Sequence, residues 1–170
     1  MNQVIENKKE EVKQDNDSQI YVACLSSYNS GILHGKWIKP ENDLEDLKEQ
    51  INQVLKSSPI PNAEEYAIHD YNNFPNLGEY PGLDNIIKVQ EAIDEHGQYI
   101  VNAFLDNWSV EDLDHIDEAY YGEYDSFSEF AQQLALASYF DYEKWERDLS
   151  HDYHEGAGEN GTSLIFNANW

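Results

Sequence analysis

One long stretch of this chain carries many acidic residues and neither lysine nor arginine. Between Val89 and Glu143 the sequence has 14 carboxylates but neither lysine nor arginine. Within it, DEAYYGEYDSFSEFA (residues 117–131) interleaves five carboxylates with five aromatic rings. The rings can form a core, so the stretch is expected to fold with its acids on the surface, where they cannot neutralise one another. A positively charged partner is therefore expected.

The negative charge is concentrated in the C-terminal part of the chain. The 170 residues carry a net charge of −24, of which residues 1–18 contribute −2, residues 19–75 contribute −4 and residues 76–170 contribute −18. Ordinary solvated surfaces mix both signs. We expect neither nucleic acid nor an anionic membrane as a partner, because both repel such a chain. Basic protein surfaces or cations are the natural partners.

The hydrophobic pattern predicts an α+β fold, since 40% hydrophobic residues are enough for a core. We divide the chain into a mobile tail and three small subdomains. These are the tail at 1–18, an N-terminal antiparallel sheet with a helix at 19–75, a central helical part at 76–108 and an acidic C-terminal α/β part at 109–170.

The N-terminal subdomain is expected to contain three strands and one helix. Strands at 20–25 and 32–38 form a hairpin around a turn at 28–31, and a third strand covers 65–71. A helix capped by Asp43 runs to about Leu55.

Further along, helices are expected at 83–96, closed by Gly97, and at 98–108. Two capping patterns follow. Ser109 with Asp112 begins a short helix at 110–118, and Ser126 with Glu129 begins one that runs to about Tyr139. The remaining expected elements are a strand at 119–124, a helix at 141–149 and a terminal hairpin of 152–156 with 162–167.

The predicted helices gather acids on one side. Asp84, Glu91 and Glu95 fall within about 40° of one another around the first central helix. On the next short helix, Glu111, Asp114 and Glu118 fall within about 60°, away from the apolar positions. Acidic helix faces are therefore expected beside one another.

No catalytic motif stands out, and we expect neither an enzyme nor a cofactor. Carboxylates are so abundant that a pair at the separation needed for glycoside hydrolysis carries almost no information. His151, Asp152, His154 and Glu155 are more simply read as exposed strand-edge residues than as metal ligands. The match to GxGxxG at 156–161 lacks a following helix, so it is expected to be a hairpin loop.

The location suggested by the sequence is the cytoplasm. The N-terminus has no apolar segment typical of a signal peptide. The single cysteine, Cys24, allows no intrachain disulfide and lies in an apolar run, so we expect it to be buried.

Four segments in this order resemble the ArdA-type antirestriction proteins. They are IYVACLSSYNSGILHGKWI, EEYAIHDY, DEAYYGEYDSFSEFA, and YFDYEKWERDL followed by a late DY. The resemblance covers about residues 19–166.

The resemblance implies a protein of plasmids, phages or transposons that acts inside a bacterial host cell. It also implies an elongated homodimer that mimics B-form DNA. Such a protein occupies the DNA-binding groove of type I restriction-modification enzymes, formed by their specificity and methyltransferase subunits, and protects incoming DNA. The signature acids of the family correspond here to Asp117, Glu118, Glu123, Asp125 and Glu129. Asp141, Glu143 and Asp148 match in the later segment.

We expect sixteen carboxylates to form the DNA-mimicking surface. They are Asp84, Glu91, Glu95, Glu111, Asp112, Asp114, Asp117, Glu118, Glu123, Asp125, Glu129, Asp141, Glu143, Asp148, Asp152 and Glu155. Phe104, Leu105 and Trp108 are candidates for the dimer contact, with burial inside one subunit as an equal alternative. The competing function is that of an acidic chaperone-like or salt-adapted protein that binds other basic partners.

Overall fold

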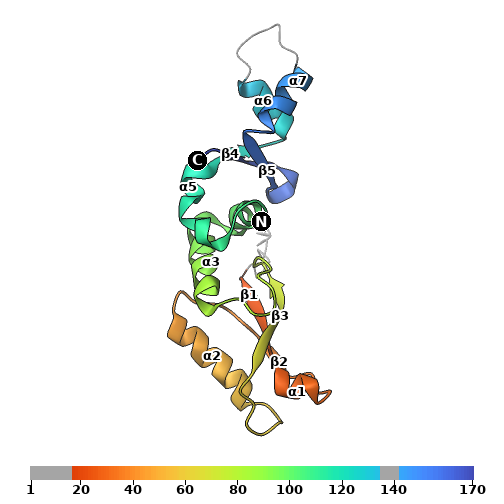
Figure 1. Ribbon diagram of the computed structural model, residues 1–170, viewed down its shortest axis with the longest axis vertical. Coiled ribbons are helices and arrows are strands. Elements are labelled where there is room, and N and C mark those ends of the chain that lie inside the picture. The colour runs from red at the N-terminus through yellow and green to blue at the C-terminus, as the bar shows by residue number, and fades with distance from the viewer. Residues whose placement is uncertain (1–16, 135–141) are drawn as a thin grey trace, which may run out of the picture.

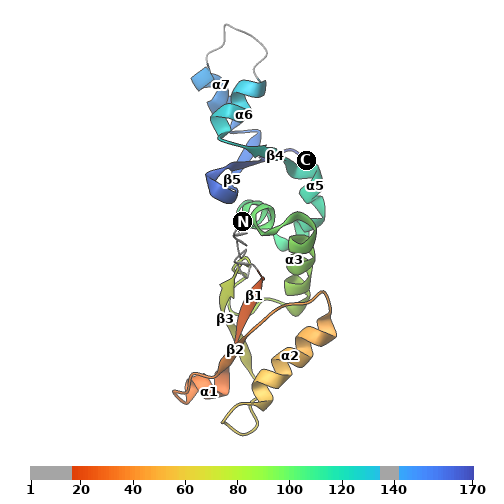
Figure 2. The same cartoon turned by 180° about the vertical axis from the view of Figure 1, so that it is seen from behind.

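The chain folds into an elongated α+β structure in which helices separate two sheets along the long axis (Figure 1). The structure, a computed structural model, describes residues 17–134 and 142–170, with side chains at 142 and 143 left out. At one end lies a three-stranded sheet, followed by helices, a second sheet and a final helix pair (Figures 1 and 2). The predicted fold class is confirmed. The subdomain boundaries stay a prediction, and most of the predicted tail lies outside the described residues.

The N-terminal sheet has the antiparallel order β2-β1-β3 and is covered on one face by α2. Its elements are β1 (Gln19–Cys24), β2 (Gly35–Ile38), β3 (Tyr66–Asn72) and α2 (Leu44–Lys56). The predicted cap is confirmed, because the Asp43 carboxylate accepts hydrogen bonds from the backbone N–H groups of Glu45 and Asp46 at 2.8 and 3.2 Å.

The predicted hairpin turn at 28–31 is confirmed, because the backbone N–H of Gly31 donates to the Tyr28 carbonyl at 2.9 Å and β1 pairs with β2. The short helix α1 (Leu25–Asn29) that leads into it was not predicted. Ser27 at its centre is buried, and its hydroxyl lies 2.8 Å from that of Ser58, which follows α2. This contact joins α1 to a residue 31 positions away in the sequence. Ile32 and Leu33, predicted to be in the second strand, lie before β2 and are exposed.

The central part contains α3 (Leu83–His96), α4 (Gln98–Leu105), the 3₁₀ helix η1 (Val110–His115) and α5 (Ile116–Ala119). The limits of α3 are those predicted, because Gly97 adopts φ 86°, a conformation that favours glycine and ends the helix. The helix predicted at 98–108 ends earlier, at Leu105. In the described ranges, no helix is long and apolar enough to cross a membrane.

The C-terminal sheet has the antiparallel order β4-β6-β5, which places the last strand in the middle. Its elements are β4 (Tyr120–Tyr124), β5 (Tyr153–Ala157), β6 (Ser163–Asn167), the short η2 (Glu159–Gly161) and the helices α6 (Phe127–Leu134) and α7 (Tyr142–Leu149). The terminal hairpin is confirmed. The predicted end of the α6 helix, near Tyr139, lies outside the described residues.

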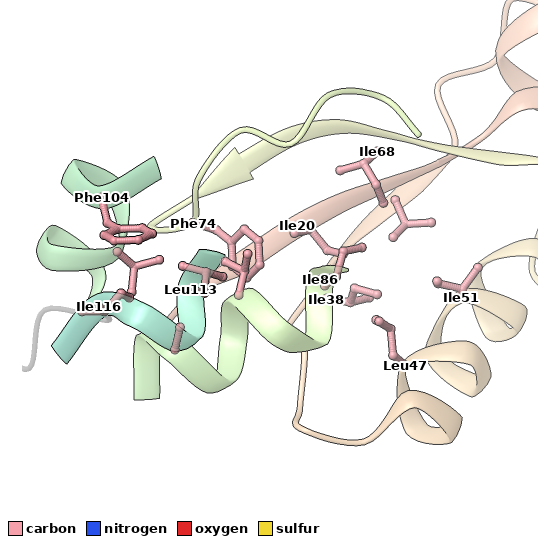
Figure 3. Close-up of a cluster of buried hydrophobic side chains, with 14 of the residues drawn as sticks. Ile20, Ile38, Leu47, Ile51, Ile68, Phe74, Ile86, Phe104, Leu113 and Ile116 are labelled. Atoms are coloured by element: carbon pink, nitrogen blue, oxygen red, sulfur yellow. The ribbon is translucent and has the colours of Figure 1, made fainter. Parts of the chain in front are cut away.

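A continuous hydrophobic core runs from the first sheet into the second. Figure 3 shows Ile20 and Ile38 of the N-terminal sheet on the same cluster as Ile86 of α3 and Leu113 of η1. The cluster continues to Phe166 of β6. A smaller cluster of Phe130, Ala131, Leu149 and Ile165 anchors α6 and α7. The core positions the acidic elements that lie over it.

Replacing Gly156 by Ala is expected to lower the free energy of unfolding by about 1–3 kcal/mol, because β5 packs closely on α4. A Cβ atom at this position would overlap the Cβ of Ala103 and lie 3.1 Å from its Cα. Urea denaturation measures the change. Ala157→Ser, at the next and exposed position of β5, is the control. Equal stabilities of the two variants would contradict the predicted close packing.

Candidate functional site: an acidic face

Two neighbouring hollows bring carboxylates from five elements together. The first, of about 230 Å³, lies between α3 and the η1–α5 segment. The second, of about 160 Å³, lies between the α3–α4 turn, β4 and η2. His96 borders both hollows, so they adjoin. We call the carboxylates that line them the acidic face: Glu91, Glu95, Asp114, Asp117, Glu123 and Glu159.

Glu159 was not among the predicted site residues. It lies in the loop between β5 and β6, which the sequence alone predicts only as a hairpin loop. The C-terminal hairpin folds back and places this loop beside the α3–α4 turn. Only the strand pairing brings Glu159 to the acidic face, and no local spacing in the sequence indicates it.

Two basic groups lie among these acids, and the sequence reading missed both positions. The His96 ring has Nδ1 at 3.6 Å from Asp117 Oδ1 and Nε2 at 3.8 Å from Glu95 Oε2. Lys88 Nζ donates to the Glu111 carbonyl at 3.1 Å and to Asp114 Oδ2 at 3.3 Å. Both groups link α3 to the η1–α5 segment. They therefore help to set the spacing between the carboxylates of these elements.

Most of the predicted carboxylates are exposed. Asp141 and the side chain of Glu143 lie outside the described residues. Of the other fourteen, only Asp112 and Glu129 are half-buried. The Asp117 side chain is 83% exposed and that of Asp114 is 77% exposed, even though Asp114 pairs with Lys88. Exposed carboxylates of this kind are available to a basic partner.

The two half-buried acids begin helices. Asp112 Oδ2 accepts from the backbone N–H of Ser109 at 3.0 Å and from its hydroxyl at 2.8 Å. Glu129 Oε2 accepts from the backbone N–H of Asp125 at 2.9 Å, while the backbone N–H of Glu129 donates to Ser126 Oγ at 3.1 Å. Both sequence patterns therefore mark helix starts, and these two acids have a structural role.

Replacing Asp112 by Asn is expected to lower Tm by roughly 1–3 °C at neutral pH and to have little effect at low pH. The hydrogen bonds from the Ser109 side chain and backbone lower the pKa of Asp112. Because the folded pKa is below the unfolded value of about 3.9, this stabilisation is present above pH 4 and is lost as the pH falls through the folded pKa. Thermal denaturation between pH 7 and pH 2.5 measures the difference.

The control for this prediction is Asp106→Asn, which removes one exposed charge at the end of α4. It accounts for the relief of like-charge repulsion that any neutralised acid brings. A difference in Tm between wild type and Asp112→Asn that stays constant over the whole pH range would contradict the proposed cause.

Other predicted carboxylates lie away from the two hollows. Asp84 is at the opposite end of α3 and lies near Lys48 of α2, whose pKa is raised mainly by the hydrogen bond to Glu45 and to a smaller extent by the charge of Asp84. Glu118 Oε2 is 3.5 Å from His115 Nδ1. The remaining exposed acids outside the hollows are Glu111, Asp125, Asp148, Asp152 and Glu155. The predicted set is therefore distributed over the central and C-terminal parts.

The aromatic rings of β4 pack against α6 and β6. Tyr121 and Tyr124 pack edge-to-face on Phe130 of α6, with ring centroids at 5.2 and 5.1 Å. Tyr120 packs on Phe166 of β6 at 5.5 Å. Desolvation is the main cause of the raised pKa of Tyr120 and of Tyr124. These rings hold β4 in place while the Glu123 carboxylate stays exposed.

The residues considered for a dimer contact differ in burial. Phe104 is 0% exposed and packs on Trp108, with ring centroids 4.7 Å apart, and on Phe166 at 6.2 Å. Its ring therefore belongs to the core of one subunit, the alternative that the sequence left open. Leu105 and Trp108 are half-buried and line a hollow of about 330 Å³ together with Leu77.

The metal site considered at residues 151–155 has no suitable set of ligands in the described part of the chain. Within residues 17–134 and 142–170, no three or more His, Cys, Asp or Glu side chains are placed to hold a metal ion. In the segment considered for a metal, Asp152 accepts from Asn169 Nδ2 at 3.3 Å and Glu155 accepts from Ser163 Oγ at 2.6 Å. The carboxylates of this segment are thus partly engaged in local hydrogen bonds.

Comparison with known proteins identifies the family. The family model described as "Antirestriction protein (ArdA)" matches residues 20–163, which is most of the chain. No curated protein matches the chain. The matched range includes nearly all of the first sheet, the central helices and all six carboxylates of the acidic face. The chain therefore belongs to the ArdA family of antirestriction proteins.

Proposed function

We propose that this protein inhibits type I restriction-modification enzymes by occupying their DNA-binding groove. The observation that supports the proposal is the set of exposed carboxylates of α3, η1, α5 and β4 that line two adjoining hollows, in a chain of an antirestriction family. These carboxylates take the place of phosphates opposite the lysine and arginine side chains of the enzyme. Duplex DNA presents one negative charge per about 1.7 Å of its axis.

The amount of charge is sufficient for a DNA substitute of useful length. One chain carries a net charge of −24. Two chains in a homodimer carry 48 net negative charges, which corresponds to about 80 Å of duplex at the charge density of DNA. This is an upper bound, because not every acid faces the enzyme. The elongated shape seen in Figure 1 suits a long binding groove.

The mechanism is competition, and it requires no bond to be made or broken. Carboxylates held on helices and strands over a packed core keep their spacing without the partner. Long-range attraction between the acidic face and a basic groove speeds the encounter, and this attraction weakens as salt is added. Bound protein then excludes DNA from the specificity and methyltransferase subunits, so incoming DNA is protected.

The homodimer is part of this proposal. Leu105, Trp108 and Leu77 line a partly apolar hollow that is available for a contact between two copies. Analytical ultracentrifugation of the wild type and of Leu105→Asp measures the state of association. If the wild type sediments as a monomer, the dimer is no longer part of the proposal. Inhibition by a single chain would then still be tested by the competition experiment.

The test is competition for a type I methyltransferase. A fluorescent duplex with the recognition sequence is bound to the enzyme, and the protein is added at about 50 mM and about 200 mM salt. Displacement of the duplex that weakens at the higher salt is expected. Failure to displace the duplex at low salt would contradict the proposal.

A second titration tests whether the effect is specific. The same protein is added to an unrelated basic protein, such as lysozyme, under the same conditions. Much tighter binding to the methyltransferase is expected if the carboxylates match its groove. Equal affinity for both would favour the alternative of a general acidic, chaperone-like protein.

A further inference from the structure

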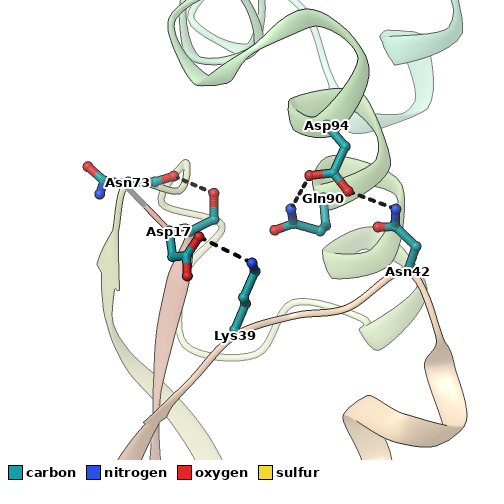
Figure 4. Close-up of polar contacts among 7 residues, drawn as sticks. Asp17, Lys39, Asn42, Asn73, Gln90 and Asp94 are labelled. Atoms are coloured by element: carbon teal, nitrogen blue, oxygen red, sulfur yellow. Dashed lines mark hydrogen bonds and ion pairs between the residues drawn. The ribbon is translucent and has the colours of Figure 1, made fainter. Parts of the chain in front are cut away.

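Polar side chains meet where the N-terminal sheet joins α3 (Figure 4). Asn42 Nδ2 and Gln90 Nε2 each donate to the Asp94 carboxylate at 2.8 Å. Lys39 Nζ donates to Asp17 Oδ1 at 3.2 Å. Asp17 and Lys39 flank β1 and β2 of the sheet, whereas Gln90 and Asp94 belong to α3. We call this group the polar joint.

Gln90 has a buried acceptor without a donor. Its side chain is 3% exposed, and Oε1 is the one buried side-chain N or O atom of the described residues that has no hydrogen-bond partner. The orientation of the amide is determined by Asp94, because turning it over would place two oxygens against each other. A buried acceptor without a donor destabilises the folded state, so a donor that reaches it is favoured.

Lys39 is the cation of the polar joint. Its pKa is raised mainly by the hydrogen bond to Asp17 and by the charge of that residue, with smaller effects from Glu41 and Asp94. The Asp94 carboxylate thus attracts the Lys39 ammonium weakly. In the view of Figure 4, the Gln90 oxygen points to the side on which Lys39 lies. The Lys39–Asp17 pair is half-exposed, at 43% and 54%, and pairs of this kind contribute little to stability.

We propose that Lys39 is a switchable strap across the polar joint, with one state on Asp17 and a second state in which Nζ donates to Gln90 Oε1 beside Asp94. The backbone of Lys39 stays in place, because its carbonyl accepts from Gln50 Nε2 at 3.2 Å. In the proposed second state the four-carbon side chain turns from Asp17 towards Gln90 while the backbone stays in place. This state satisfies the buried oxygen, gives up an exposed ion pair and removes part of the ammonium from water.

The two states differ in what they connect. The Lys39–Asp17 pair lies within the N-terminal sheet unit, whereas a Lys39–Gln90 bond crosses to α3. The second state therefore stiffens the joint between the sheet and the helix that carries Glu91 and Glu95. Asp94 is a positioning residue in this device, although it is exposed like Glu91 and Glu95. The switch sets how freely the acidic face moves relative to the N-terminal sheet.

The test uses two readouts and variants with opposite expected effects. Asp17→Asn weakens the first state, so the side-chain carbonyl ¹³C resonance of Gln90 is expected to shift downfield, as for an amide that gains a donor. Spin labels at Asn52→Cys of α2 and Asn102→Cys of α4, both exposed positions, report the distance across the joint. Cys24 is fully buried and stays unlabelled. The distance distribution is expected to narrow in Asp17→Asn and to broaden in Lys39→Met.

The matched control is Lys48→Met, which removes another lysine with a surface ion pair, to Glu45 at 2.7 Å. It is expected to leave the Gln90 resonance and the distance distribution as in the wild type. Circular dichroism confirms that each variant is folded. A Gln90 resonance that is the same in Asp17→Asn, Lys39→Met and the wild type would overturn the proposal, whatever the outcome of the inhibition assays.

Discussion

Neutralising four residues of the acidic face, Glu91→Gln, Glu95→Gln, Asp117→Asn and Glu123→Gln, is expected to weaken inhibition of a type I enzyme by roughly 15- to 600-fold. These side chains come from α3, α5 and β4 and surround the two hollows that adjoin at His96. Each exposed contact with a basic groove is expected to contribute about two- to fivefold in affinity. Any one substitution should therefore have a small effect, and the losses should accumulate.

The measurement is the concentration of protein that halves DNA binding by the methyltransferase, at one fixed salt concentration. The matched control neutralises four exposed acids of the N-terminal subdomain, Glu41, Glu49, Glu64 and Glu65, and so has the same net charge. Because only the position of the removed charge differs, the control should inhibit almost as well as the wild type. Equal losses in both quadruple variants would show that total charge matters and that the acidic face does not.

Replacing Phe104 by Ala is expected to lower the free energy of unfolding by about 3–5 kcal/mol, a large part of the stability of an ordinary domain. The ring is fully buried and packs on Trp108, Phe166 and Trp170, with the last two at centroid distances of 6.2 and 6.3 Å. It therefore joins α4 to β6 and to the C-terminal residue. Removing it leaves a cavity where the central helices meet the second sheet.

Guanidinium chloride denaturation followed by tryptophan fluorescence measures this loss. Leu33→Ala is the control, because Leu33 is 88% exposed and its truncation should change the free energy of unfolding by less than about 0.5 kcal/mol. A near-neutral Phe104→Ala variant with unchanged cooperativity would contradict the burial of this ring within one subunit. Such a result would instead favour a contact of the Phe104 ring between two subunits.

Helix starts and ends were the most predictable part of the fold. Asp43 caps α2 and Gly97 ends α3 as predicted, because both depend on groups within a few residues. The short helix α1 before the turn at 28–31 was not predicted. Ser27 at its centre contacts Ser58, and a contact over such a separation leaves no periodic pattern.

The candidate site was predictable in its composition and much less in its arrangement. The charge count alone indicated that acids cover the central and C-terminal parts. It did not separate Asp112 and Glu129, which are engaged in helix starts, from the freely exposed carboxylates. It also counted only lysine and arginine, whereas the ring of His96, within that stretch, lies between Glu95 and Asp117.

The sequence by itself determined the α+β class, the local limits of the best capped helices and the concentration of negative charge after residue 76. Each of these follows from composition or from contacts between near neighbours along the chain. Only the tertiary structure decided that β6 is the central strand of its sheet and that Glu159 joins Glu123 at one hollow. Strand order and the packing of loops on helices are set by long-range contacts, and no spacing within a segment encodes them.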